Sequence, residues 1–206
     1  MISVKFDSFG SLSNNCYLIT DEKSGKSALI DCTEYSEKMR NFIGNADLEY
    51  ILLTHGHYDH ISGVRDVKKL TGAKAVIAAE DEPMLSSARH SLAVFCGGEQ
   101  NDTTADIIVD DNDVIKLGES EIKVIKTPGH TDGSVCYICD DKLFCGDTLF
   151  YCSCGRTDFP TGSTQKMLDS LKKLSQLKGD YKVYPGHDSF STLDFERKNN
   201  PYMKNR

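Results

Sequence analysis

The segment Thr54-His55-Gly56-His57-Tyr58-Asp59-His60 contains three imidazoles and one carboxylate. It directly follows the apolar run Tyr50-Ile51-Leu52-Leu53, which predicts a buried strand. A strand that runs into a turn fixes the backbone where these side chains leave it, and histidine with aspartate is a ligand mix that suits zinc or iron. The segment therefore predicts a metal site at the end of a strand.

Three further candidate ligands lie just beyond other strand-like runs. His130 and His187 each follow a Pro-Gly pair, and Asp147 follows a glycine. These residues are turn formers that end a strand abruptly. Five of the six histidines thus recur at the same kind of place, which buried structural histidines have no reason to do. The sixth, His90, lies in a stretch that predicts a helix, and we expect it to be a surface or capping residue.

Residue periodicity predicts a layered α/β domain. Many strands come early with helices interspersed, an order that excludes a simple sandwich or a helical bundle. The predicted strands are 2–6, 15–20, 26–31, 50–54, 74–78, 107–109, 113–117, 121–126, 134–139, 142–145 and 181–184. The predicted helices are 35–45, 61–71, 80–89, 163–177 and 191–199.

Length and composition agree with a single domain over residues 1–206, because no Pro- or Ser-rich linker or low-complexity run divides the chain. The formal net charge of −7 argues against a nucleic-acid surface, which needs clustered lysine and arginine. The N-terminus, Met1 to Phe6, alternates like a strand and lacks the basic and apolar regions of a signal peptide. No stretch has the apolar length that spans a bilayer. We therefore expect a cytoplasmic protein.

The eight cysteines are expected to be thiols in a reducing compartment. Cys136-x-x-Cys139 and Cys152-x-Cys154 together offer four sulfurs, but residues three apart on a strand point to opposite faces, so the first pair would not converge on one ion. Cys152 and Cys154 precede the turn at Arg156, and a regulatory thiol there stays open. Buried sheet positions are predicted for Cys16, Cys32, Cys136, Cys139 and Cys145.

In their order along the chain, the candidate ligands and their local contexts resemble the metallo-β-lactamase superfamily, and within it the short glyoxalase II-like hydrolases. The resemblance extends from the first strand to the last helix. Two segments carry it below the superfamily level, CGRTDFP at 154–160 and ERKNNPY at 196–202. The full set of candidate ligands is His55, His57, Asp59, His60, His130, Asp147 and His187.

The resemblance implies an αβ/βα four-layer sandwich with the metals at one edge between the two sheets. It also implies two divalent metal ions, zinc with iron and manganese as alternatives, and a hydroxide between them that attacks a substrate carbonyl. Asp59 would orient this hydroxide as the catalytic residue. The implied ligands of one ion are His55, His57 and His130, those of the other are Asp59, His60 and His187, and Asp147 bridges the two.

The resemblance also implies a substrate contact. In glyoxalase II a basic residue in the turn after the bridging aspartate holds a carboxylate of glutathione, and Arg156 occupies the matching place. The alternative is a structural arginine that pairs with Asp158. Two departures weaken glutathione specificity. Asp158 stands where an aromatic contact is expected, and the chain ends at Arg206, where full-length glyoxalase II continues into a helical domain.

We therefore predict a binuclear metal-dependent hydrolase of small acyl thioesters, with S-lactoylglutathione or a related thiol ester as substrate and no nucleic-acid or membrane partner. The oligomeric state is not indicated. One alternative is a mono-iron persulfide dioxygenase that would use His55, His130 and Asp147. Another is a lactonase or β-lactam hydrolase with the same two zinc ions. A metal-stabilised interaction module without catalysis is disfavoured, because a structural ion needs only four ligands.

Overall fold

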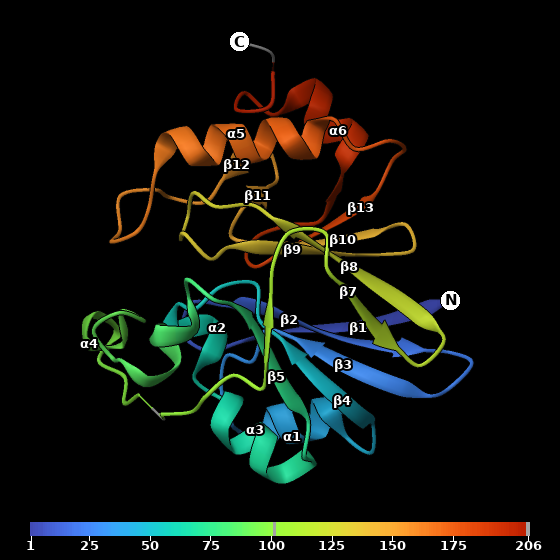
Figure 1. Ribbon diagram of the computed structural model, residues 1–206, viewed down its shortest axis with the longest axis vertical. Helices are drawn as coiled ribbons and strands as arrows, with labels where there is room; N and C mark the ends of the chain where they lie inside the picture. Colours follow the sequence, from blue (N-terminus) through green and yellow to red (C-terminus); the bar gives the residue numbers. More distant parts are fainter. Residues whose placement is uncertain (101, 205–206) are drawn as a thin grey trace.

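The computed structural model describes residues 1–100 and 102–204, which form a single α/β domain with two facing sheets between two outer helical layers (Figure 1). The predicted four-layer sandwich is confirmed. The first sheet has the strand order β1 (Ile2–Phe9), β2 (Asn14–Asp21), β3 (Lys26–Ile30), β4 (Asp47–Leu52), β5 (Lys74–Ala78) and β6 (Ile107–Val109). The second sheet has the order β14 (Ser191–Thr192), β13 (Lys182–Pro185), β10 (Lys142–Gly146), β9 (Val135–Cys139), β8 (Ser120–Lys126) and β7 (Val114–Leu117).

Each sheet contains parallel neighbours, which need a crossover connection. In the first sheet β3, β4 and β5 run parallel, and in the second sheet β10 and β13 do so. Figure 1 shows α1 and α3 on the outer face of the first sheet and α5 and α6 on the outer face of the second. None of the helices in the described residues is long and apolar enough to cross a membrane. The helices are α1 (Glu37–Ile43), α2 (Tyr58–Ile61), α3 (Val64–Thr71), η1 (Glu82–Ser86), α4 (Ala93–Cys96), α5 (Thr164–Ser175) and α6 (Leu193–Asn199).

The buried core has three parts, two between a sheet and its helices and one between the two sheets. On β3, Leu29 packs toward the helices and its neighbour Ile30 packs toward the other sheet. Both faces of this strand are therefore apolar, as expected for a parallel strand between two layers. Cys136 and Cys139 face opposite sides of β9 and join different parts of the core, as predicted. All five cysteines that were predicted to be buried are buried.

Every predicted strand occurs, with ends shifted by a few residues, but three short strands were missed. They are β11 (Leu149–Phe150), β12 (Ser153–Cys154) and β14, each with only two residues, too short to show a period. The predicted helix 61–71 is divided into α2 and α3 near Gly63. A Cβ at Gly63 would lie 2.4 Å from the backbone oxygen of Glu34, so the chain passes too close for any side chain there.

The predicted helix 80–89 is wrong. Only a single 3₁₀ helix, η1, forms in this stretch, and an exposed turn follows it and contains His90. The buried Asp81 side chain directly before η1 accepts hydrogen bonds from two other loops, so tertiary contacts fix this stretch instead of helix propensity. The expected surface position of His90 is correct although the expected helix is absent.

Candidate metal centre

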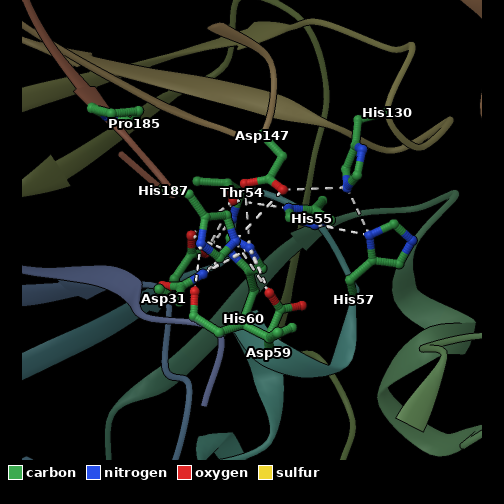
Figure 2. A network of polar contacts seen from close by, with 12 residues as sticks. Asp31, Thr54, His55, His57, Asp59, His60, His130, Asp147, Pro185 and His187 are labelled. Atoms are coloured by element: carbon green, nitrogen blue, oxygen red, sulfur yellow. Dashed lines mark hydrogen bonds and ion pairs between the residues drawn. The ribbon is translucent and has the colours of Figure 1, made fainter. Parts of the chain in front are cut away.

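All seven candidate ligands lie at one edge of the sandwich, where strand ends of both sheets meet (Figure 2). The first sheet contributes the segment His55 to His60, which follows β4 and enters α2. The second sheet contributes His130 after β8, Asp147 after β10 and His187 after β13. Figure 2 shows His130 and Asp147 projecting toward the segment from the first sheet. The structure therefore brings together all the residues that the sequence analysis grouped.

Three imidazoles form the first group, and their ring nitrogens face one another. His57 Nδ1 lies 3.1 Å from His55 Nε2 and 2.8 Å from His130 Nε2. All three side chains are buried. These three atoms define one cluster whose geometry could hold a metal ion.

The second group combines a carboxylate with two imidazoles. Asp59 Oδ2 lies 3.2 Å from His187 Nε2 and 3.7 Å from His60 Nε2. His60 is fully buried, whereas His187 is partly exposed and lines the cavity described below. These atoms define another cluster that could hold a metal ion.

Asp147 lies between the two groups. Its Oδ1 is 3.4 Å from His60 Nε2, and its Oδ2 is 3.5 Å from His130 Nε2 and 3.8 Å from His187 Nε2. Oδ1 is buried and has no hydrogen-bond partner. A buried carboxylate oxygen without a donor is costly unless a cation compensates it.

Contacts on the outer side of the histidine rings determine which nitrogens carry protons. His130 Nδ1 donates to the backbone oxygen of Arg156 at 2.7 Å, and His187 Nδ1 donates to the backbone oxygen of Leu12 at 3.1 Å. His60 Nδ1 lies 2.8 Å from Asp31 Oδ2. Because carbonyl and carboxylate oxygens only accept, the outer nitrogen of each ring carries a proton, and the inner nitrogen offers a lone pair whenever the ring is neutral. Such outer contacts are typical of metal-binding histidines.

The electrostatics differ between the two groups. Burial, reinforced by the neighbouring imidazoles, lowers the pKa of His57 to about 3 and lowers the pKa of His55 well below its usual value. Burial acts the same way on His60, but three carboxylates, led by that of Asp31, outweigh it and raise the pKa of His60 well above its usual value. Burial would raise the pKa of Asp147, yet the adjacent His60 and other imidazoles hold it below its usual value. His55 and His57 are thus neutral, whereas the second group pairs imidazoles with negative charge.

The donor set and its geometry fit metal ions. Inward lone pairs that face carboxylate oxygens repel one another unless a proton or a cation lies between them. Imidazole and carboxylate are ligands of zinc, iron and manganese alike. Besides these two clusters, His55, His60 and Asp147 form a third that overlaps both, so the seven side chains offer more donors than a single tetrahedral ion needs.

Two aspartates that support the candidate ligands were not identified from the sequence. Asp31 accepts hydrogen bonds from Thr54 N at 2.8 Å and Thr54 Oγ1 at 2.9 Å, in addition to its contact with His60. Asp31 directly follows the apolar strand β3, so it shows the same strand-end signal as the ligands, and this signal could have found it.

The other unidentified aspartate is Asp81, which joins the loops of both sheets. Its carboxylate accepts from Gly56 N at 2.9 Å, from Thr131 Oγ1 at 2.7 Å and from Gly133 N at 2.9 Å. It therefore fixes the His55–His57 loop relative to the His130 loop. Burial raises the pKa of Asp81 despite these hydrogen bonds. Nothing in its sequence context signals this role.

A cavity of about 450 Å³ opens over the two groups. Arg156 lies in the wall of this cavity, where it could contact a substrate. Its guanidinium also donates two 2.7 Å hydrogen bonds to Asp158, so the structural pairing given as the alternative is present as well. Cys152 and Cys154, for which a regulatory role was left open, are not among the described residues that line the cavity, whereas Cys96 is. The described lining residues are Leu12, His57, Asp59, Ser91, Leu92, Phe95, Cys96, His130, Asp147, Phe150, Arg156, Phe159 and His187.

Comparison with known sequences gives a consistent family. The sequence model of the Metallo-beta-lactamase superfamily matches residues 10–187. The hydroxyacylglutathione hydrolase GloC of Haemophilus influenzae is 30% identical over 202 residues, which cover 93% of this chain and 93% of that protein. A hydroxyacylglutathione hydrolase of Bradyrhizobium sp. (strain ORS 278) is 35% identical over 184 residues, which cover 87% of this chain and 65% of that protein.

Solved structures agree. The BLEG-1 B3 metallo-beta-lactamase superposes with a TM-score of 0.92 at 26% identity, covering 98% of this chain and 100% of that one. TTHA1623, solved in a di-iron-bound form, has a TM-score of 0.85 at 28% identity over 97% of this chain and 100% of that one. ETHE1 from Myxococcus xanthus has a TM-score of 0.79 at 28% identity over 97% of this chain and 83% of that one.

Proposed function

The chain belongs to the metallo-beta-lactamase superfamily, and from this premise we propose that it is a binuclear metal-dependent hydrolase of small acyl thioesters. The observation that carries the proposal is the position of Asp147 between two separate ligand groups, with one buried oxygen that no hydrogen bond satisfies. A single-ion enzyme would have no use for the second group.

In this proposal each group would hold one divalent ion, and Asp147 would be a ligand of both. The ions are zinc, with iron and manganese as alternatives, since the donor set accepts all three. When bound, they would supply a water that loses its proton near neutral pH and would polarise a carbonyl oxygen. The proposed ligands are His55, His57 and His130 for one ion, Asp59, His60 and His187 for the other, and Asp147 for both.

The chain's own residues would orient the reactants. Asp59 lines the cavity, so its carboxylate can accept a hydrogen bond from the attacking water and hold it in position. The contact of His60 with Asp31 and that of His130 with the Arg156 carbonyl fix the planes of these two rings. The C–S bond of the thioester then breaks, and the sulfur leaves as a thiolate, which needs little help from an acid because a thiol has a pKa of about 8.5.

Thioesters are favoured as substrates by the names of the relatives. Two hydroxyacylglutathione hydrolases match most of this chain, and one of them is of similar length. S-lactoylglutathione or a related thiol ester is therefore the first substrate to test.

Two other candidates retain specific support. The likeness to ETHE1 fits a mono-iron persulfide dioxygenase that uses His55, His130 and Asp147. The likeness to BLEG-1 fits a β-lactam or lactone hydrolase with the same ligands. The convergence of Asp59, His60 and His187 favours a thioester, lactone or β-lactam hydrolase over the dioxygenase, because a single iron in the dioxygenase would not use these three residues as ligands.

The deciding experiment measures metal content and activity on the same preparation. We expect turnover of S-lactoylglutathione by protein that contains two ions per chain, with slower turnover of a lactone and a β-lactam. Oxygen consumption with a persulfide by protein that holds one iron would instead establish the dioxygenase. Faster turnover of the lactone or the β-lactam would leave the binuclear centre in place and refute the thioester assignment.

A further inference from the structure

The wall of the cavity over the candidate metal centre is largely apolar. Four separate segments contribute to it: the β1–β2 turn, the start of α4, the β11 strand and the loop after β12. This wall, called the apolar wall below, consists of Leu12, Leu92, Phe95, Phe150 and Phe159.

The apolar wall adjoins both ligand groups. The ring of Phe159 packs edge-on against that of His57, with 5.8 Å between centroids. The ring of Phe150 packs edge-on against that of His187 at 6.2 Å. A substrate whose carbonyl reaches the centre would therefore pass close to these rings.

Two side chains of the wall are exposed to an unusual degree. Phe95 is 79% exposed and Leu12 is 54% exposed, although both are large and apolar. Covering them with an apolar group would remove this surface from water, which is favourable in proportion to the area. A charged, strongly hydrated group placed there would lose solvation without gaining a partner.

Positive charge for a carboxylate is scarce in the cavity. Among the described lining residues, Arg156 is the only lysine or arginine. Its Nε and Nη2 each donate to an oxygen of Asp158 at 2.7 Å, and its Cζ lies 4.0 Å from the centre of the Phe159 ring. A carboxylate of the substrate would have to displace Asp158 from this fork-to-fork pair. Both partners are more than half exposed, so the pair is weak, but it still competes with the substrate.

We infer that the site selects thioesters whose thiol arm is apolar and uncharged over those carried by glutathione. The inference rests on the proposed thioester hydrolysis and adds the chemical class of the thiol. The apolar wall would bind the arm, and Arg156, held by Asp158 and stacked on Phe159, would act as part of the wall and not as a carboxylate clamp.

The test compares the lactoyl thioesters of benzyl mercaptan and of glutathione, which share the acyl group and differ in the arm. With zinc-loaded protein we expect kcat/KM to be at least about tenfold higher for the benzyl ester. Phe95→Ala should lower kcat/KM for the benzyl ester by about 3- to 10-fold and change it little for the glutathione ester. Equal or better use of the glutathione ester, with no effect of Phe95→Ala on the benzyl ester, overturns the inference.

A second variant tests the role of Asp158. Asp158→Ala frees the Arg156 guanidinium, so kcat/KM for the glutathione ester should rise by up to about fivefold while that for the benzyl ester is unchanged. The matched control is Glu119→Ala, which removes another exposed ion pair, Lys23 to Glu119 at 3.0 Å, away from the cavity. Glu119→Ala should change kcat/KM for neither ester. A fall in kcat/KM for both esters with Asp158→Ala would mean that the Arg156–Asp158 pair supports the loop, and this result would overturn the proposed role of Asp158.

Calorimetric binding of the thioether analogues of both esters separates the inference from the proposed reaction. Tighter binding of the benzyl analogue without turnover of either ester would support the selection and refute only thioester hydrolysis. Equal binding of the two analogues overturns the selection, whichever ester is hydrolysed.

Discussion

Two aspartates, Asp21 at the end of β2 in the first sheet and Asp147 directly after β10 in the second, have very different surroundings. β2 begins at Asn14, which contacts His60, and it ends at Asp21. Asp21 accepts hydrogen bonds from Ser24 Oγ at 2.6 Å and Ser120 Oγ at 2.9 Å, together with two backbone N–H groups. Asp147 has imidazoles on all sides and one oxygen without a hydrogen bond.

The comparison separates a carboxylate that serves the fold from one that serves a ligand. Asp21 joins the first sheet to the β7–β8 turn of the second, and folding itself supplies all its partners. Among the described residues, Asp147 gains no hydroxyl or backbone N–H donor from folding. The imidazoles around it offset its charge, but its Oδ1 has no hydrogen bond, and a cation would compensate this oxygen. The following changes test this distinction, from the largest expected effect to the smallest.

Replacing Asp147 should have the largest effect. Asp147→Ala removes the carboxylate that, alone among the residues that the structure describes, contacts both ligand groups, so thioester turnover should fall by more than about 100-fold and the bound metal should decrease. The measurement is kcat with elemental analysis of the same sample. The exposed His90 provides the control, because His90→Ala should retain nearly full activity. Comparable losses in both variants would show that the site has been placed wrongly.

Asp31 tests the support behind one ligand. Its backbone is left-handed, with φ of 57°, a conformation that asparagine tolerates, so Asp31→Asn should keep the fold. The amide cannot replace the charge beside His60 Nδ1, and affinity for the ion at His60 should fall by about 10- to 100-fold. Zinc titration followed by calorimetry would measure the two affinities. The control is Asp141→Asn, which changes an exposed carboxylate. An equal loss of affinity for both ions in Asp31→Asn would contradict the assignment of His60 to one of them.

Replacing Asp21 should change the stability of the fold and not the activity. Its hydrogen bonds, first those of Ser24 and then the Glu119 backbone, lower its pKa in the folded state below the usual 3.8. A lowered folded pKa means that the stabilisation is complete above the usual pKa and is lost as the pH falls below it. Asp21→Asn should therefore lower Tm at neutral pH, and the difference from the unchanged protein should shrink below about pH 4. Thermal unfolding across this range would reveal it, and a difference that grew in acid would refute the reasoning.

Arg156 should give the smallest effect. Because Asp158 already occupies its guanidinium, Arg156→Ala should change KM for the glutathione thioester by less than about threefold. Steady-state kinetics at neutral pH would suffice. An increase of about 10- to 100-fold, confined to KM, is the value expected for loss of a charge-assisted substrate contact. Such an increase would show that Arg156 binds a carboxylate of the substrate.

The sequence was most informative where the signal is local. Each candidate ligand lies within a few residues of the end of an apolar strand, in the turn or short helix that follows, and both features can be read within about ten residues. The same kind of signal gave the longer strands. It failed for β11, β12 and β14, because two residues are too few to show alternation.

The supporting residues depend on contacts between distant parts of the chain. Asp81 accepts hydrogen bonds from Gly56 and from Gly133, 25 and 52 residues away. These contacts fix the stretch 80–89 in a conformation other than the helix that local propensity predicted. The pairing of Arg156 with Asp158 is local and was anticipated, but the apolar wall was not, because its residues come from four segments that only the fold brings together.

The number of metal ions that activity requires tests the central claim most directly. Metal-free protein would be titrated with zinc while thioester turnover and bound zinc are followed together. Two ligand groups joined by Asp147 predict that turnover reaches its maximum only at two ions per chain. Full activity at one ion per chain, with no second ion bound in excess zinc, would contradict the account.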